Sequence, residues 1–205
     1  AATRQLIIEA AERLFAEHGV TAVSNRQVSE AAGQGNNTAV GYHFGGKADL
    51  VRALARNRHQ QVEHLRQEMV EQVRGSTEVR DWIACLVLPT TRHLAASGSP
   101  TWYARFAAQA ATEPAFAEVI SVEAMNSPAL NDVRDGLEAC LPRLPRTVRQ
   151  QRAAMARTLM VHTVADRERA LAEGTEPSAE SWEAAAHGLI DALTGLWTAP
   201  VTPID

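Results

Sequence analysis

The sequence contains few cysteines and almost no lysine. Its 205 residues include two cysteines, Cys85 and Cys140, without a CxxC motif or a Cys/His pair at metal-binding spacing. These features predict neither a disulfide framework nor a zinc site. Sparse cysteine is typical of a reduced compartment, so we expect a cytoplasmic protein. Lysine occurs once, at Lys47, among 20 basic residues.

Long apolar runs and strand patterns are also missing. No apolar run approaches about 18 residues, the length that indicates a membrane-spanning helix, and we expect no membrane partner. The opening Ala-Ala-Thr-Arg has no signal-peptide pattern. The sequence shows no sustained two-residue alternation and no Asn-Gly or Asp-Gly hairpin between apolar runs. These absences argue against β-structure.

An excess of positive charge is missing as well. The net charge is −4, from 20 basic and 24 acidic side chains, which excludes a globally basic nucleic-acid binder but not a locally adapted one. Residues 178–205 carry four acids and neither Lys nor Arg, so residues 1–177 balance at 20 against 20. Binding to DNA would therefore depend on where the positive groups lie.

The apolar residues recur at three- and four-residue steps, which predicts an all-α fold. We expect a three-helix domain over residues 1–46 and a helical bundle over residues 47–205. The expected helices are 3–18, 25–32, 38–44, 47–73, 79–96, 100–111, 113–125, 128–141, 146–173 and 178–197.

Residues 24–44 carry the pattern of a helix-turn-helix. Ser24 and Gln27 have the spacing of a capping box, and residues 33–37 form a Gly- and Asn-rich turn before a second short helix. Such a pair of helices can place one helix in a major groove. On pattern alone, the same segment also fits an ordinary corner of a helical protein. The polar groups able to reach base edges are Asn36, Asn37 and Thr38, and those able to reach phosphates are Tyr42, His43 and Lys47.

Four motifs occur in a fixed order along this region. They are I-x-x-A-A-x-x-L-F-A-x-x-G at 7–19, V-S-E-A-A-G at 28–33, Y-H-F at 42–44 and G-K-x-x-L at 46–50. Residues 3–54 thus resemble the DNA-binding domain of the tetracycline-repressor (TetR) family. The resemblance implies a homodimeric transcriptional regulator, most often a repressor. Such a regulator binds a palindromic operator in double-stranded DNA and is released by a small-molecule effector. The resemblance thus implies a helix-turn-helix DNA-binding domain over residues 1–46 and a helical effector-binding and dimerisation domain over residues 47–205.

The resemblance also implies roles for single residues. Tyr42, His43 and Lys47 match positions that contact backbone phosphate, and Arg26 matches a position that contacts backbone or base. The stretch from 33 to 42 is one residue longer than the family's common turn. Which of Asn36, Asn37 and Thr38 faces a base therefore stays open. For Tyr42 the alternative is a ring packed in the three-helix core, the place we expect for Phe44.

The remaining helices carry apolar faces that predict an interface and a pocket. Paired with their symmetry mates, the last two helices would make a four-helix interface, as in TetR-like proteins, although the same side chains also fit an intrachain core. The expected interface residues are Met155, Leu159, His162, Trp182, Ala186, Leu189, Leu193 and Trp197. Large side chains in the middle helices fit either a core or an apolar ligand site. The candidates there are Trp82, Leu86, Trp102, Tyr103, Phe106 and Gln109.

Patterns for catalysis are not found. The sequence has no Ser/His/Asp arrangement, nucleophile elbow or phosphate-binding loop, so we expect neither an enzyme nor a cofactor or metal. Two alternatives to an effector-controlled repressor stay open. One is a DNA-binding regulator controlled by a protein partner or by oxidation of Cys85 and Cys140. The other is a small helical ligand-binding protein or enzyme that contains a helix-turn-helix-like fold.

Overall fold

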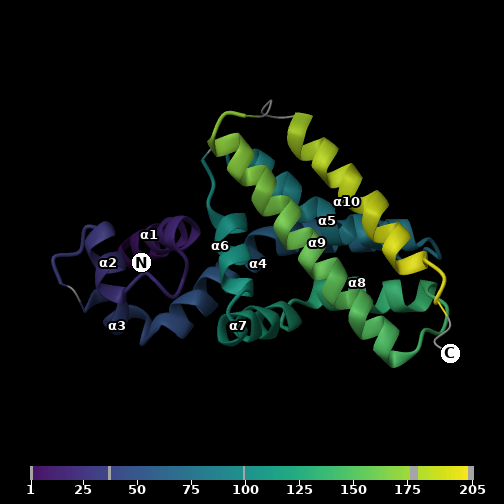
Figure 1. Ribbon diagram of the computed structural model, residues 1–205, viewed down its shortest axis with the longest axis horizontal. Helices are drawn as coiled ribbons and strands as arrows, with labels where there is room; N and C mark the ends of the chain where they lie inside the picture. The colour runs from purple at the N-terminus through teal and green to yellow at the C-terminus, as the bar shows by residue number, and fades with distance from the viewer. Residues whose placement is uncertain (1, 37, 99, 176–179, 203–205) are drawn as a thin grey trace. The chain divides into compact units, whose positions relative to one another are not determined.

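A computed structural model describes residues 2–36, 38–98, 100–175 and 180–202. Every regular element in these ranges is an α-helix, which confirms the predicted all-α fold (Figure 1). The first half of the chain forms α1 (Ala2–His18), α2 (Asn25–Ala31), α3 (Ala39–Phe44), α4 (Lys47–Val73) and α5 (Val79–Ala96). The second half forms α6 (Tyr103–Ala111), α7 (Pro114–Met125), α8 (Pro128–Cys140), α9 (Arg146–Ala172) and α10 (Glu180–Thr198). In these ranges we find no helix both long and apolar enough to cross a bilayer.

The start of α2 and the end of α1 follow the local signals in the sequence. The Ser24 hydroxyl accepts a hydrogen bond from the Gln27 amide at 3.2 Å, and the Gln27 side chain accepts one from the Ser24 amide at 2.8 Å. This confirms the predicted capping box. After α1, Gly19 has φ +87° and its amide donates to the Phe15 carbonyl at 3.0 Å. A glycine tolerates this left-handed conformation, so α1 ends there.

The first of two compact units contains the helix-turn-helix. It comprises the residues up to Gln61 and Pro100–Ser127, so α6 and α7 belong to it together with α1, α2, α3 and the start of α4. Phe15 of α1 and Phe106 of α6 are both fully buried, with ring centroids 6.1 Å apart. This contact joins α6 to the first helix. The functional boundary after residue 46 is a separate matter and stays a prediction.

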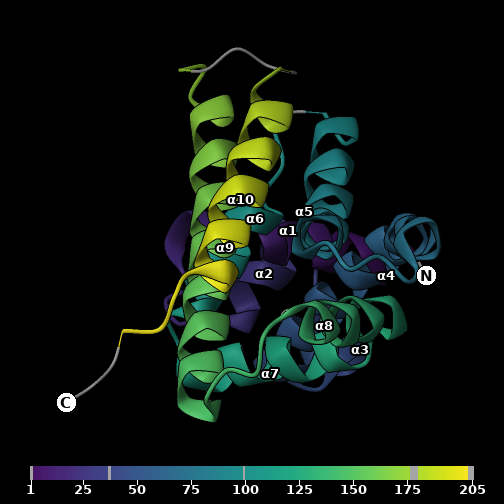
Figure 2. The ribbon, with the colours of Figure 1, turned by 90° about the vertical axis from the view of Figure 1, so that its right-hand side faces the viewer.

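The second compact unit comprises Val62–Ser99 and the chain from Pro128 onward. Within it α5 packs against α8 and α10, and α9 lies alongside α10 (Figures 1 and 2). Ile83, Leu94 and Leu193 are among its fully buried side chains. The helices α5 and α8 approach closely at Gly136, which faces the ring of Trp82.

Replacing Gly136 by alanine is expected to lower the free energy of unfolding by about 1–3 kcal/mol. A Cβ there would lie 2.4 Å from ring atoms of Trp82. The buried indole cannot retreat easily, because its N–H donates to the Ser76 carbonyl at 3.1 Å. Urea denaturation followed by circular dichroism measures the loss. Gly41→Ala is the control: a methyl group there meets no atom within 4 Å, so stability should hold or rise. Equal stability of the two variants would show that the Trp82 contact is not tight.

Candidate nucleic-acid interface

A buried hydroxyl group fixes α2 against α3. Ser29 is fully buried; its hydroxyl donates to the Asn25 carbonyl at 3.1 Å and accepts from the Val40 amide at 3.3 Å. The bond to Val40 joins the two helices of the helix-turn-helix directly. Sequence reasoning did not single out Ser29. The available signal was a serine next to the buried Val28, because a polar side chain at a buried position must find a partner.

The turn before α3 is organised by Asn36. The Asn36 side-chain oxygen accepts hydrogen bonds from the Thr38 amide at 3.0 Å and from the Thr38 hydroxyl at 2.6 Å. This is a local turn of the kind that asparagine favours, and it presents both exposed side chains at the start of α3. Asn37, the third predicted base-contacting residue, lies outside the described residues. A contact from Asn36, Asn37 or Thr38 to a base stays a prediction.

Tyr42 projects from α3 into solvent. It is 86% exposed, and its ring meets the half-buried His43 edge to face, with centroids 5.0 Å apart. The alternative in which the Tyr42 ring packs in the three-helix core is therefore wrong. Phe44 does pack against that core, and the Arg4 guanidinium lies 4.6 Å from the centre of its ring. On α3, therefore, the Tyr42 ring and its hydroxyl face solvent, whereas the Phe44 ring packs against the core.

Two of the predicted DNA-contacting cations already have partners within the chain. Lys47 Nζ donates to the Val20 carbonyl at 3.0 Å and the Thr21 carbonyl at 3.4 Å, so it ties the start of α4 to the turn after α1. Burial lowers the pKa of Lys47. The exposed Arg26 pairs with Glu30 at 2.7 Å, and this hydrogen bond raises the pKa of Arg26. Both remain candidate phosphate contacts, but a phosphate would replace or share these partners.

The predicted ligand-binding residues are divided between the two compact units. Trp82 and Leu86 lie on α5 in the second unit, the first buried and the second half-buried. The other four belong to the first unit: Tyr103 and Phe106 are buried, Trp102 is half-buried and Gln109 is exposed. Tyr103 and Phe106 pack in the same hydrophobic core as Phe15. A ligand contact from any of the six stays a prediction.

The predicted interface residues fall into two groups. On α9, Met155 and Leu159 are 55% and 37% exposed, and His162 is exposed as well. On α10 the five predicted residues are buried inside the second unit, where α10 packs against α5 and α9. They are Trp182, Ala186, Leu189, Leu193 and Trp197. In this conformation a partner chain could reach only the opposite face of α10.

The described residues hold no group of three or more His, Cys, Asp or Glu side chains that could bind a metal ion. The two thiols are poorly suited to oxidation. Burial, with the nearby Asp81, raises the pKa of Cys85 to about 11, and burial also raises the pKa of Cys140. Since the thiolate is the reactive form, both shifts disfavour oxidation of these cysteines at neutral pH.

Comparison with known proteins matches both parts of the chain. The family model for bacterial regulatory proteins of the tetR family matches residues 7–54. The model for the tetracyclin repressor-like C-terminal domain matches residues 84–195, more than half of the chain.

Curated relatives match a part of the chain. The HTH-type transcriptional repressor AcnR of Corynebacterium glutamicum is 38% identical over 87 residues, which cover 40% of this chain and 46% of AcnR. The HTH-type transcriptional regulator TtgR of Pseudomonas putida is 43% identical over 63 residues, covering 31% of this chain and 30% of TtgR. The matches thus span less than half of either relative. The two family models and the helical architecture together show that the chain belongs to the tetR family of bacterial regulatory proteins.

Proposed function

We propose that this protein is a transcriptional regulator that binds operator DNA through α3. The exposed Tyr42 is the observation that carries the proposal, because its phenolic hydroxyl stands in solvent on α3, where it can donate a hydrogen bond to a phosphate oxygen. The bond from Ser29 to Val40 holds α3 at a fixed orientation to α2. The relatives named as a repressor and a regulator support the same activity. We therefore also propose that the protein acts in the cytoplasm, where operator DNA lies.

Selection from a pool of random double-stranded DNA tests this proposal. The full chain is expected to enrich fragments that contain a short palindrome. A single α3 contacts too few bases for a selective site, whereas two copies related by two-fold symmetry contact two half-sites. A variant with Tyr42→Ala serves as the control and should enrich little. Recovery of no common sequence by the unaltered chain would contradict the proposal.

The dimer expected for such a regulator can form on the exposed faces of α9 and α10. Met155, Leu159 and His162 recur at helical spacing on the exposed face of α9. The exposed face of α10 carries small residues at the same kind of spacing, namely Ala184, Gly188, Ala192 and Gly195. Small side chains let a second helix approach closely, and Met155 and Leu159 supply apolar area to bury. We therefore propose that the interface is formed by the exposed faces of α9 and α10, and not by the side chains of α10 that are buried within the chain.

Leu159→Arg is expected to weaken dimerisation by at least about 100-fold, because each copy would bury an unpaired guanidinium. Sedimentation velocity over a range of protein concentrations measures the change. Gln150→Arg adds the same charge to an exposed position on a different face of α9 and should leave the dimer intact. A Leu159→Arg chain that dimerises as tightly as the unaltered chain would place the interface elsewhere.

We propose that a small-molecule effector regulates the binding of this protein to its operator. The match of residues 84–195 to a repressor-like C-terminal domain supports it. Binding is expected to shift the population toward a state with lower operator affinity. Control by cysteine oxidation has less support, because burial raises the pKa of both thiols. Release of a fluorescent operator fragment during a compound screen is the measurement. If oxidant alone released the fragment, and Cys85→Ser abolished that response, the redox alternative would replace the effector.

A further inference from the structure

Arg4, in the first turn of α1, lies over an aromatic ring of α3. Its guanidinium carbon is 4.6 Å from the centre of the Phe44 ring, and Arg4 is exposed. Phe44 is half-buried against the core, so the guanidinium covers a part of the ring that the core leaves open. A cation is attracted to the face of an aromatic ring. This contact therefore restricts a long and otherwise flexible side chain to a position beside α3.

The contact with Phe44 leaves the hydrogen-bond donors of Arg4 available. A guanidinium has five N–H donors, and a phenylalanine ring offers no oxygen or nitrogen atom to accept from them. Within the part of the chain that the structure describes, no carboxylate pairs with Arg4. In contrast, Arg26 pairs with Glu30, and Lys47 donates to two backbone carbonyls. Of these three cations, Arg4 is the one that can bind an anion without displacing a partner in the protein.

Phe44 lies between the candidate phosphate contacts of the chain. Tyr42 and His43 precede it on α3, and Lys47 begins α4 three residues later. The guanidinium over Phe44 therefore lies beside the segment that faces the phosphate backbone if α3 docks as proposed above. Arginine and phosphate form short, charge-assisted hydrogen bonds, often two at once.

We propose that Arg4 binds a backbone phosphate of the operator, so that the DNA interface extends from α3 to the start of α1. No motif of the sequence pointed to Arg4, because its position depends on how α1 packs against α3. Phe44 is then a positioning residue, which holds the guanidinium in place before DNA binds. The inference rests on the proposed operator binding and adds to it a contact that does not read the base sequence.

Arg4→Gln tests the inference. It is expected to weaken binding to the selected palindrome by about 10- to 100-fold at about 0.1 M salt. The slope of log affinity against log salt should become less steep by about 1.8, because the dimer would neutralise two phosphates fewer. Arg4→Lys keeps the charge and should keep most of the slope. Fluorescence anisotropy of a labelled palindrome measures both quantities, and an unchanged unfolding midpoint would show that the exposed substitution does not disturb folding.

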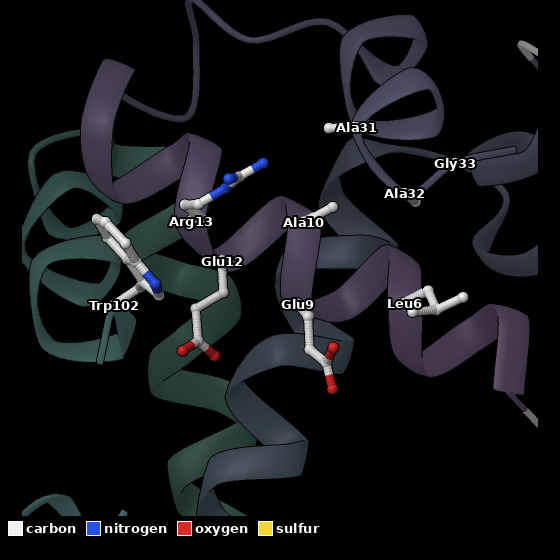
Figure 3. A pocket seen from close by; sticks show the side chains of 9 residues that line it. All are labelled: Leu6, Glu9, Ala10, Glu12, Arg13, Ala31, Ala32, Gly33 and Trp102. Atoms are coloured by element: carbon white, nitrogen blue, oxygen red, sulfur yellow. The ribbon is translucent and has the colours of Figure 1, made fainter. Parts of the chain in front are cut away.

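Arg13→Gln is the matched control. Arg13 is also exposed on α1, but it follows Arg4 by nine residues, which is about two and a half turns and places it on the opposite side of the helix. Figure 3 shows Arg13 at a depression that Leu6 and Ala10 of α1, the end of α2 and Trp102 also line. Arg13→Gln removes the same charge from the chain, so it should weaken binding by less than about threefold and leave the slope unchanged.

Three results would overturn the inference. An unchanged slope with Arg4→Gln would show that Arg4 neutralises no phosphate. Equal losses with Arg4→Gln and Arg13→Gln would show that these charges act only from a distance. Selection of a different palindrome by Arg4→Gln would place Arg4 on a base edge. In each case Tyr42→Phe would still weaken binding if α3 docks as proposed, whereas a chain that selects no palindrome contradicts the proposed function itself.

Discussion

Replacing Phe106 by alanine is expected to lower the free energy of unfolding by about 3–5 kcal/mol. The Phe106 side chain has no exposed surface, and its ring centre lies 6.1 Å from that of Phe15 and 5.8 Å from that of Tyr103. Alanine would remove a ring that joins α6 to α1 and leave a cavity in the core beneath the helix-turn-helix. Urea denaturation, followed by the circular dichroism signal of the helices, measures the loss. The free energy of unfolding is obtained from a fit to the first unfolding transition.

Phe116→Ala is the matched control for Phe106→Ala. Phe116, on α7, is half-buried against the same core, so its truncation removes less buried area and should cost less than half as much. The comparison also separates two roles for Phe106. A residue that mainly contacts an effector would lose effector binding with little loss of stability. Equal costs for the two variants would contradict the central packing of Phe106.

The all-α fold could be predicted from the sequence because its signals are local. Helical spacing of apolar residues, the Ser24–Gln27 capping box and Gly19 each act within a few residues, and each is found in place. The role of Ser29 could not be predicted in the same way, since its partner Val40 lies 11 residues away in another helix. Such a bond depends on how α2 and α3 pack.

The faces of the longer helices show a second limit of the sequence. An apolar stripe on α10 predicts burial, but the stripe does not say whether the chain itself or a second copy covers it. Trp182 and Leu193 face α10's own chain, which leaves the small residues Ala184 and Gly188 outward. The partners of the polar residue Lys47 could not be predicted from the sequence either. The family resemblance indicates a phosphate contact, whereas in the structure the Lys47 ammonium group donates hydrogen bonds to two backbone carbonyls.

Tyr42→Phe is expected to weaken operator binding by roughly 100-fold in the dimer. Each half-site would lose one hydrogen bond from the hydroxyl to a charged phosphate, about 1.5 kcal/mol, and the two losses add. Because Tyr42 is 86% exposed, the substitution should leave the free energy of unfolding within about 0.5 kcal/mol of the unaltered value. Fluorescence anisotropy with the selected palindrome, at several salt concentrations, measures the affinity.

The salt dependence and the second tyrosine make this prediction specific. Tyr42 is neutral, so its loss should lower the affinity at every salt concentration without changing the slope of log affinity against log salt. Loss of a cation that displaces counterions would reduce that slope. Tyr103→Phe removes the chain's other phenolic hydroxyl from a buried position and should leave operator affinity unchanged. If Tyr42→Phe and Tyr103→Phe bind the palindrome equally well, the Tyr42 hydroxyl does not touch the phosphate backbone and the proposed docking of α3 is wrong.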